Sequence, residues 1–164
     1  MFEKGSYVIY KRDVCKIADI FKSKVNNMEY YRLSPISDES LIINVPTDNK
    51  TGYLKRLLTK EEIEKLIDNI PNIMPVEADS HSLDNVYKEL FHSGNHEDLI
   101  KIIKTTYLRN KHRKEAKRSI GQKDDEYFKK AEKYLYNEFS VVLGMSFDET
   151  KKYVIDKVKE NVKD

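Results

Sequence analysis

Residues 1–58 alternate apolar and polar positions with the period of about two that is typical of half-buried strands. Aromatic and β-branched residues fill the apolar positions, and turn signals such as Asn26-Asn27 and Ser34-Pro35 separate the segments. The pattern predicts four or five short strands, at 7–10, 14–21, 28–33 and 41–45, with the fifth around 53–57. Strands of this number and length indicate a small β-barrel.

From residue 59 onward the apolar positions follow helical spacing. Thr59 and Glu62 form a capping-box pattern ahead of the first apolar stripe, and Pro71 ends that helix. Residues 71–82 contain two prolines and a polar run, so we expect a domain linker there. The remaining stripes predict four helices in 83–164.

Capping residues support these helix boundaries. We expect Gly94 to end the helix that starts at Leu83 in a left-handed cap, and Asn95 to cap the next helix. Ser146 and Glu149 repeat the capping-box pattern before the last helix. The spacing of the second of these four helices predicts its buried side: Leu99, Ile102, Ile103, Thr106 and Tyr107.

These elements together predict an α+β protein. Its parts are a β-barrel with a trailing helix at 1–70, a linker at 71–82 and an all-α domain at 83–164. Hydrophobic residues make up 39% and charged residues 35% of the 164 residues, which is typical of a folded, highly charged protein. We find neither a signal peptide nor a membrane-spanning stretch, and Cys15 has no disulfide partner, so we expect a cytoplasmic protein without a membrane partner.

Positive charge is concentrated in one short window. Residues 101–118 contain eight Lys or Arg and one Glu, although the net charge of the chain is only +2. Pairs such as Arg109 with Arg113 and Lys114 with Arg118 are i,i+4 like-charge pairs, which repel each other on a helix. An external polyanion is expected to offset this repulsion, and the alternative is a solvated helix face.

Residues that could organise a reaction are sparse. His92 and His96 have the spacing of a zinc-binding helix, but the helix stop between them directs their rings apart. The acidic run 124–126 is explained by the partial positive charge of a helix N-terminus. With no paired nucleophile and base and no Gly-rich phosphate loop, we expect no enzyme, no metal and no cofactor.

Several segments, taken in order, resemble a known family. In the first half they are 2–10 (FEKGSYVIY), 14–20 (VCKIADI), 30–33 (YYRL) and 41–46 (LIINVP). In the second half they are 91–94 (FHSG) and 129–135 (KKAEKYL). The ordered set resembles the CarD/CdnL family of bacterial transcription regulators, although no single segment is diagnostic.

The resemblance implies a Tudor-like barrel that binds the RNA polymerase β subunit, and a helical domain that binds double-stranded or fork promoter DNA. Such a protein changes the stability of the open complex without catalysis. We expect it to work as a monomer in the cytoplasm, associated with the nucleoid through RNA polymerase. The implied polymerase-contacting residues are Lys22, Ser23, Lys24, Ile43, Asn44, Val45 and Pro46. The alternative for Leu41, Ile43 and Val45 is that they simply face the core.

The implied DNA-contacting residues combine the basic window with two residues upstream of it: His81, Lys88, Arg109, Lys111, Arg113, Lys114, Lys117 and Arg118. The chain departs from the family in several respects, two of which bear on the proposed contacts. Well-known members carry a Trp that wedges into the minor groove, whereas this chain has no Trp and has Ser80-His81-Ser82 in that region. They also often carry Arg where Asn44 stands. We therefore expect DNA binding that relies on phosphate contacts and is more salt-sensitive.

A second function remains open from the sequence alone, an RNA- or ribosome-binding adaptor. Small barrels and basic helices also serve RNA, and four tyrosines in the predicted strands could stack on bases: Tyr7, Tyr10, Tyr30 and Tyr31. The competing explanation for these rings is packing inside and across the strands.

Overall fold

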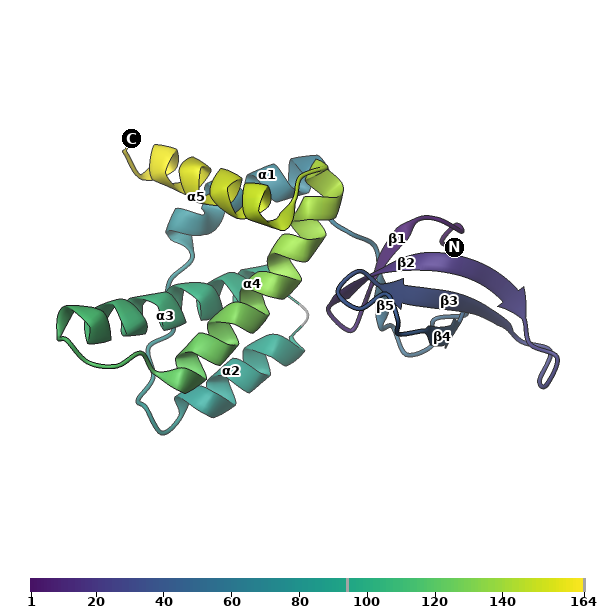
Figure 1. Cartoon of the computed structure of the whole chain (residues 1–164), viewed down its shortest axis with the longest axis horizontal. Coiled ribbons are helices and arrows are strands. Elements are labelled where there is room, and N and C mark those ends of the chain that lie inside the picture. The colour runs from purple at the N-terminus through teal and green to yellow at the C-terminus, as the bar shows by residue number, and fades with distance from the viewer. Residues whose placement is uncertain (94, 164) are drawn as a thin grey trace. The chain divides into compact units, whose positions relative to one another are not determined.

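The computed structural model describes residues 1–93 and 95–163, so the predicted cap at Gly94 lies outside the described residues. The chain divides into two compact units, Met1–Leu58 and a second unit that begins at Thr59. Strands form the first unit and helices form the second (Figure 1), which confirms the α+β class. Within the described ranges, no helix has both the length and the apolar character needed to cross a membrane.

The first unit is one antiparallel sheet of five strands that curls into a half-barrel. Its strands are β1 (Tyr7–Tyr10), β2 (Asp13–Lys22), β3 (Glu29–Pro35), β4 (Ile43–Pro46) and β5 (Leu54–Lys55). They lie in the order β4-β3-β2-β1-β5, so β4 and β5 are the edge strands. The five predicted strands are present, with ends that differ by a few residues from the predicted ones.

Alternating side chains of these strands form the core of the half-barrel. The core residues are Val8, Cys15, Ile17, Tyr31, Leu33, Val45 and Leu54. The β1–β2 hairpin turns through Lys11 (φ 49°) and Arg12 (φ 88°), and two left-handed residues match the right-handed twist of a hairpin. A register shift between Ile17 and Asp19 leaves Ala18 as a β-bulge in β2.

The predicted start of the fourth strand is wrong by two residues. Leu41 and Ile42 precede β4 and are 47% and 62% exposed, so Leu41 does not face the core. Val45 is 6% exposed and belongs to the core, while Ile43 packs against it from a half-buried position. The inward-facing alternative is therefore confirmed for Val45.

In its described residues, 59–93 and 95–163, the second unit contains five α-helices and one short 3-10 helix. They are α1 (Lys60–Asn69), η1 (Ile70–Asn72), α2 (Leu83–His92), α3 (His96–Glu115), α4 (Gln122–Leu143) and α5 (Phe147–Lys163). The capping box at Thr59 and Glu62 is present, and Ser146 and Glu149 exchange the same pair of hydrogen bonds before α5. Asn95 caps α3 by accepting from the Glu97 N–H at 2.8 Å.

Helix α1 belongs to the helical unit, whereas the sequence predicts it as the tail of the barrel domain. Ile63 and Ile67 of α1 are fully buried, and α1 packs on α5. The Tyr153 hydroxyl of α5 donates to Glu64 at 2.5 Å. This contact joins residues far apart in the sequence, so the local pattern could not assign α1 to its unit.

The first residues of the predicted linker at 71–82 are hydrogen-bonded to the helical unit. Lys104 Nζ of α3 donates to the carbonyl oxygens of Ile70 and Ile73, the latter at 2.7 Å. The Val76 N–H donates to Thr105 Oγ1 at 2.8 Å. Residues 70–76 therefore run along α3 as a packed segment.

The buried side of α3 differs from the prediction at its last residue. Leu99, Ile102 and Thr106 are buried as expected, but Tyr107 is 56% exposed. The side of α3 that faces α4 continues instead through Arg109 and Arg113, which both contact Asp124 of α4.

Candidate binding surfaces

A buried carboxylate joins α2, α3 and α4. Asp124 is 4% exposed, and its Oδ1 accepts a hydrogen bond from the Tyr87 hydroxyl at 3.0 Å. Its Oδ2 accepts from Arg109 Nε at 3.0 Å and from Arg113 Nη1 at 2.6 Å. We call Asp124, Tyr87, Arg109 and Arg113 the Asp124 cluster.

The electrostatics of the Asp124 cluster favour the charged carboxylate. Burial pushes the pKa of Asp124 upward, but the hydrogen bonds from Arg113, Arg109 and Tyr87 outweigh burial and hold this pKa below its ordinary value. Burial, and after it the charge of Asp124, raises the pKa of Tyr87 above its ordinary value. Asp124 is therefore the structural counter-ion of two arginines, and not only a residue that suits a helix N-terminus.

This geometry corrects the reasoning about the basic window. The Arg109–Arg113 pair needs no external anion, because Asp124 lies between the two guanidinium groups. Lys101 pairs with Asp98 at 3.6 Å, and Lys104 is committed to backbone carbonyls, where burial lowers its pKa. Half of the eight basic residues are thus engaged within the unit, and Arg109 and Arg113 leave the proposed DNA-binding set.

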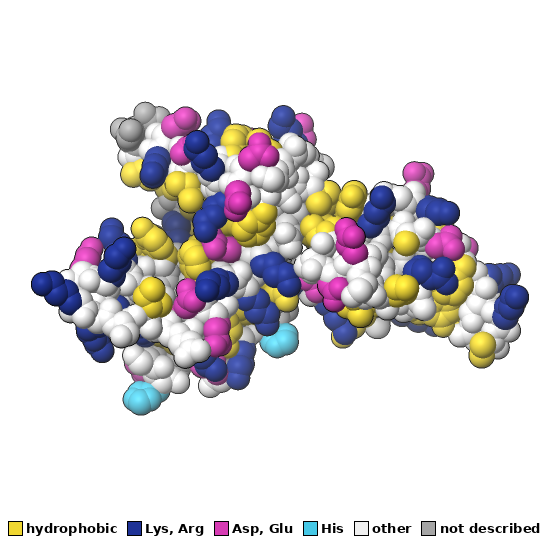
Figure 2. Space-filling view, in the orientation of Figure 1, with side chains coloured by type: hydrophobic (Ala, Val, Ile, Leu, Met, Phe, Trp, Pro, Cys, Tyr) yellow, Lys and Arg dark blue, Asp and Glu magenta, His cyan; other side chains and the backbone are white. Residues whose placement is uncertain are grey.

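The other four basic residues lie at the C-terminal end of α3 and in the turn after it. They are Lys111, Lys114, Lys117 and Arg118, which we call the α3 basic end. All four are exposed, and none forms an ion pair with a residue that the structure describes. Figure 2 shows Lys and Arg side chains around the left-hand end of the helical unit, where α3 ends in Figure 1.

The turn after α3 has a defined backbone geometry. The Arg118 N–H donates to the Arg113 carbonyl at 2.7 Å and the Lys117 N–H donates to the Lys114 carbonyl at 3.0 Å, which is the Schellman pattern. Lys117 occupies its left-handed position (φ 57°), where Gly is the usual residue because a side chain costs energy there. The turn therefore has a charged residue at a position where the left-handed backbone is unfavourable for any residue with a side chain.

The residues after the turn are anchored to α3. Asn110 Oδ1 accepts from the Gly121 N–H at 2.9 Å and from Arg113 Nη1 at 2.6 Å. A β-carbon at Gly121 would collide with the Arg113 guanidinium, so only Gly leaves room for that side chain. Both ends of 116–121 are thereby fixed next to the Asp124 cluster.

The two upstream DNA candidates differ from the α3 basic end. His81 is exposed in the turn before α2. Lys88 forms an i,i+4 ion pair with Asp84 at 3.0 Å, and Lys123 of α4 lies 3.6 Å from the same carboxylate. Lys88 therefore already has an acidic partner, in an exposed pair that contributes little to stability.

In the first unit, the edge of β4 holds the polymerase candidates Ile43 to Pro46. The Thr47 N–H donates to the Glu29 carbonyl at 3.1 Å, so by the alternation of an antiparallel ladder Val45 and Ile43 direct their N–H groups toward β3. Asn44 then directs its N–H and carbonyl toward the open edge. Pro46, the next residue with that orientation, carries no N–H, which limits the length of any added strand.

The other polymerase candidates form the tip of the β2–β3 hairpin. Lys22 and Lys24 are exposed there, and Val25 between the strands is 97% exposed. Ser23 organises the turn, since its Oγ accepts from the Val25 N–H at 3.2 Å. The tip thus presents two cations and one apolar side chain.

Cys15, His92 and His96, the groups considered for chemistry, lie in three different elements. Cys15 is fully buried, and burial raises the pKa of its thiol to about 12. His92 ends α2, whereas His96 begins α3 and lies 2.7 Å from Glu138 of α4. The two histidines therefore belong to different helices.

No protein-family model matches this sequence, and no curated protein matches it. The likeness to the CarD/CdnL family therefore rests on the residues of the chain alone.

Proposed function

We propose that this protein is a transcription regulator with two binding surfaces. The half-barrel holds a strand of the bacterial RNA polymerase β subunit along β4, and the α3 basic end binds the backbone of promoter DNA. Binding at both surfaces changes the stability of the open complex. The observation that carries this proposal is the α3 basic end, four exposed cations without an acidic partner in the described chain.

The arrangement of these cations supports a phosphate-binding role. Lys111 and Lys114 are three residues apart and share one face of α3, while Lys117 and Arg118 extend from the turn that follows. Tyr107, one turn before Lys111, adds an exposed ring to that face. The helix dipole also stabilises cations close to a helix C-terminus, by typically about 0.3–1 kcal/mol at an exposed site, and this contribution falls off within about one turn.

The polymerase contact is supported by an open strand edge. β4 lies at the end of the sheet, and Asn44 offers one backbone donor and one acceptor toward that edge. A partner strand can add there through main-chain hydrogen bonds, while neighbouring side chains select the partner. Leu41 and Ile42, both exposed just before β4, provide apolar contact area.

The experiment separates the two surfaces with two variants of the full chain. Asn44→Pro removes the outward N–H of β4, and Asn44→Ala is the matched control that keeps it. The combined variant Lys111→Gln, Lys114→Gln, Lys117→Gln and Arg118→Gln neutralises the α3 basic end. Binding to purified RNA polymerase β subunit and to fork DNA is measured for each protein.

We expect Asn44→Pro to lose polymerase binding at least tenfold while DNA binding is retained, and the fourfold Gln variant to show the opposite. Equal binding of the β subunit by Asn44→Pro and by Asn44→Ala would refute the strand-addition contact. If both variants bind the β subunit and fork DNA as tightly as the wild type does, the proposal of a regulator with two binding surfaces is refuted.

One observation favours a second candidate, an RNA-binding adaptor. Tyr107 is exposed beside the α3 basic end, and an aromatic ring next to cations can stack a base of a single strand. Two of the tyrosines predicted for this role are less suited to it, because Tyr31 is buried and Tyr30 stacks on Phe21, whereas Tyr7 is 38% exposed. Tighter binding of single-stranded RNA than of fork DNA, reduced by Tyr107→Ala, would favour the adaptor.

A further inference from the structure

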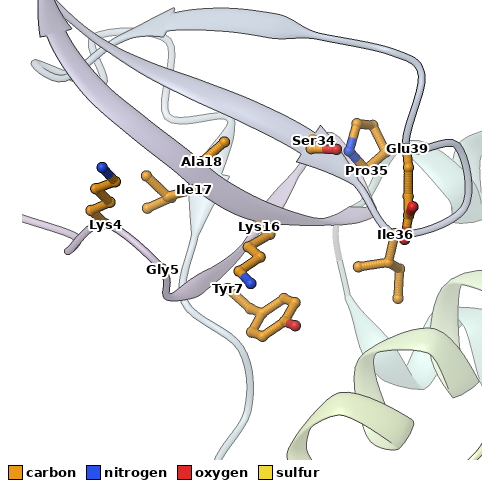
Figure 3. Close-up of a pocket in the computed structure, with 10 residues that line it drawn as sticks. All are labelled: Lys4, Gly5, Tyr7, Lys16, Ile17, Ala18, Ser34, Pro35, Ile36 and Glu39. Carbon is orange, nitrogen blue, oxygen red and sulfur yellow. The ribbon is translucent and has the colours of Figure 1, made fainter.

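The half-barrel carries a groove that is separate from both surfaces described above. The groove has a volume of about 650 Å³. Figure 3 shows the ten residues that line it: Lys4, Gly5, Tyr7, Lys16, Ile17, Ala18, Ser34, Pro35, Ile36 and Glu39. They come from the segment before β1, from β1 itself, from the middle of β2, and from the end of β3 with the loop that follows.

A row of polar side chains crosses three strands in this groove. Tyr7 of β1 is the cross-strand partner of Lys16 in β2, and Lys16 is in turn the partner of Ser34 in β3. Cross-strand partners project on the same face of a sheet, so the phenol, the ammonium and the hydroxyl lie side by side. None of these three side chains has a hydrogen-bond or ion-pair partner among the described residues.

The charge of the groove is uneven. Lys16 has no acidic partner, and Lys4, 69% exposed, is only loosely paired with Asp19 at 3.8 Å. The single carboxylate, Glu39, comes from the loop after β3. Lys16 with the Tyr7 hydroxyl therefore forms a donor-bearing part of the groove that suits a carboxylate, while Lys4 points away from these two side chains (Figure 3).

Apolar surface lies beside these donors. Ile36 contributes it from just after β3, and Ala18 contributes it from the β-bulge, where β2 has one residue more than β3, whereas Pro35 is buried. Bulges often occur next to binding sites, because they bend the strand and change the direction of its side chains. A small inorganic anion could use the donors but not this apolar area.

We propose that this groove binds an acidic segment of a partner protein, in which Asp or Glu side chains alternate with apolar ones. One carboxylate of the segment meets Lys16 and the Tyr7 hydroxyl, and an apolar neighbour covers Ile36. Glu39 repels any carboxylate of the segment that lies next to it, which limits the number of acidic residues that the groove can hold. The proposal is independent of the proposed function, because neither Asn44 nor the α3 basic end lines the groove.

The probe is the blocked peptide acetyl-Glu-Leu-Glu-Leu-Glu-amide, with the corresponding Gln peptide as its neutral control. Binding is followed by amide chemical shifts of the full chain carrying the fourfold Gln substitution at the α3 basic end, since an acidic peptide could otherwise be captured there. We expect saturable shifts at Tyr7, Lys16, Ala18 and Ser34 with the Glu peptide and none with the Gln peptide.

Two substitutions with opposite expected effects sharpen the test. Lys16→Gln should lower the affinity for the Glu peptide about fivefold, and Glu39→Gln should raise this affinity about twofold, as expected for exposed charges. Lys55→Gln, an exposed lysine of β5 outside the groove, should change nothing. Equal binding of the Gln peptide, equal affinity for inorganic phosphate, or weakening by Lys55→Gln as large as by Lys16→Gln would overturn the proposal.

Discussion

The two sides of α3 near its C-terminus carry the same charge and meet opposite environments. Arg109 and Arg113 face α4 and share the buried carboxylate of Asp124, whereas Lys111 and Lys114 face solvent without an acidic partner among the described residues. In the sequence all four belong to one basic window. The side of the helix decides which cations hold the fold together and which are available to a ligand.

The difference also explains why arginine and lysine alternate in this stretch. A guanidinium is planar and presents several donors, so Arg113 Nη1 donates to both Asp124 and Asn110 while Arg109 donates to the same Asp124 oxygen through Nε. A lysine ammonium is strongly hydrated and suits an exposed point contact with phosphate. The composition of the two sides therefore matches their two environments.

The largest expected effect comes from removing the shared carboxylate. Asp124→Ala leaves two guanidinium groups and the Tyr87 hydroxyl without their acceptor, so the free energy of unfolding should fall by about 3 kcal/mol. Urea denaturation of the full chain measures this change. Asp125→Asn, which breaks an exposed pair with Lys129 and removes one negative charge from the first turn of α4, is the control and should cost under about 1 kcal/mol. A loss below about 1 kcal/mol for Asp124→Ala would contradict the structural role of the Asp124 cluster.

The contribution of Asp124 to the free energy of unfolding should depend on pH. The pKa of Asp124 in the folded protein lies below its ordinary value of 3.8, so its contribution is present above that value and is lost as the pH falls through the folded pKa. The stability difference between the wild type and Asp124→Asn should therefore be constant near neutral pH and shrink below about pH 4. Denaturation curves of both proteins between pH 7 and pH 3 test this, and a difference that grows on acidification would have the wrong sign.

A smaller effect is expected at Gly121. Gly121→Ala places a β-carbon against the Arg113 guanidinium, which must then shift away from Asp124, at a cost of about 1 kcal/mol. In an Arg113→Ala background the clash is absent, so the same substitution should cost almost nothing. The coupling energy from this double-mutant cycle measures the contact, and additive effects would show that Gly121 does not position Arg113.

The smallest effect should appear on the solvent side. Lys117→Gly relieves the left-handed backbone of a non-glycine residue and should raise the free energy of unfolding by about 0.5 kcal/mol, while it weakens DNA binding. Lys117→Asn, which tolerates the same backbone, controls for the lost charge. Thermal unfolding and DNA titration of both variants show whether stability and binding change in opposite directions.

Local signals in the sequence were sufficient to predict most of the fold. The exchange of hydrogen bonds between Thr59 and Glu62, the cap at Asn95 and the alternation of β1 to β3 depend on neighbouring residues, and the structure contains all of them. The unit to which α1 belongs depends on Tyr153 and other residues of α5, almost ninety positions away. Periodicity over ten residues contains no information about such a contact.

The candidate site was only partly predictable for the same reason. The charge count identified the basic window but could not separate its structural cations from its available ones. That separation depends on Asp124, which lies beyond a helix break. One signal was present: an acid directly after the break, eleven and fifteen residues from two arginines spaced four apart. Asn110, which holds Gly121 and Arg113, carried no recognisable signal.

The salt dependence of DNA binding by the full chain tests the central claim most directly. If the four cations of the α3 basic end contact phosphates, the slope of log K against log salt should be about −3.5 on duplex DNA, and the fourfold Gln variant should reduce it to nearly zero without loss of stability. An unchanged slope in that variant would contradict the division of α3 into a structural and a binding side.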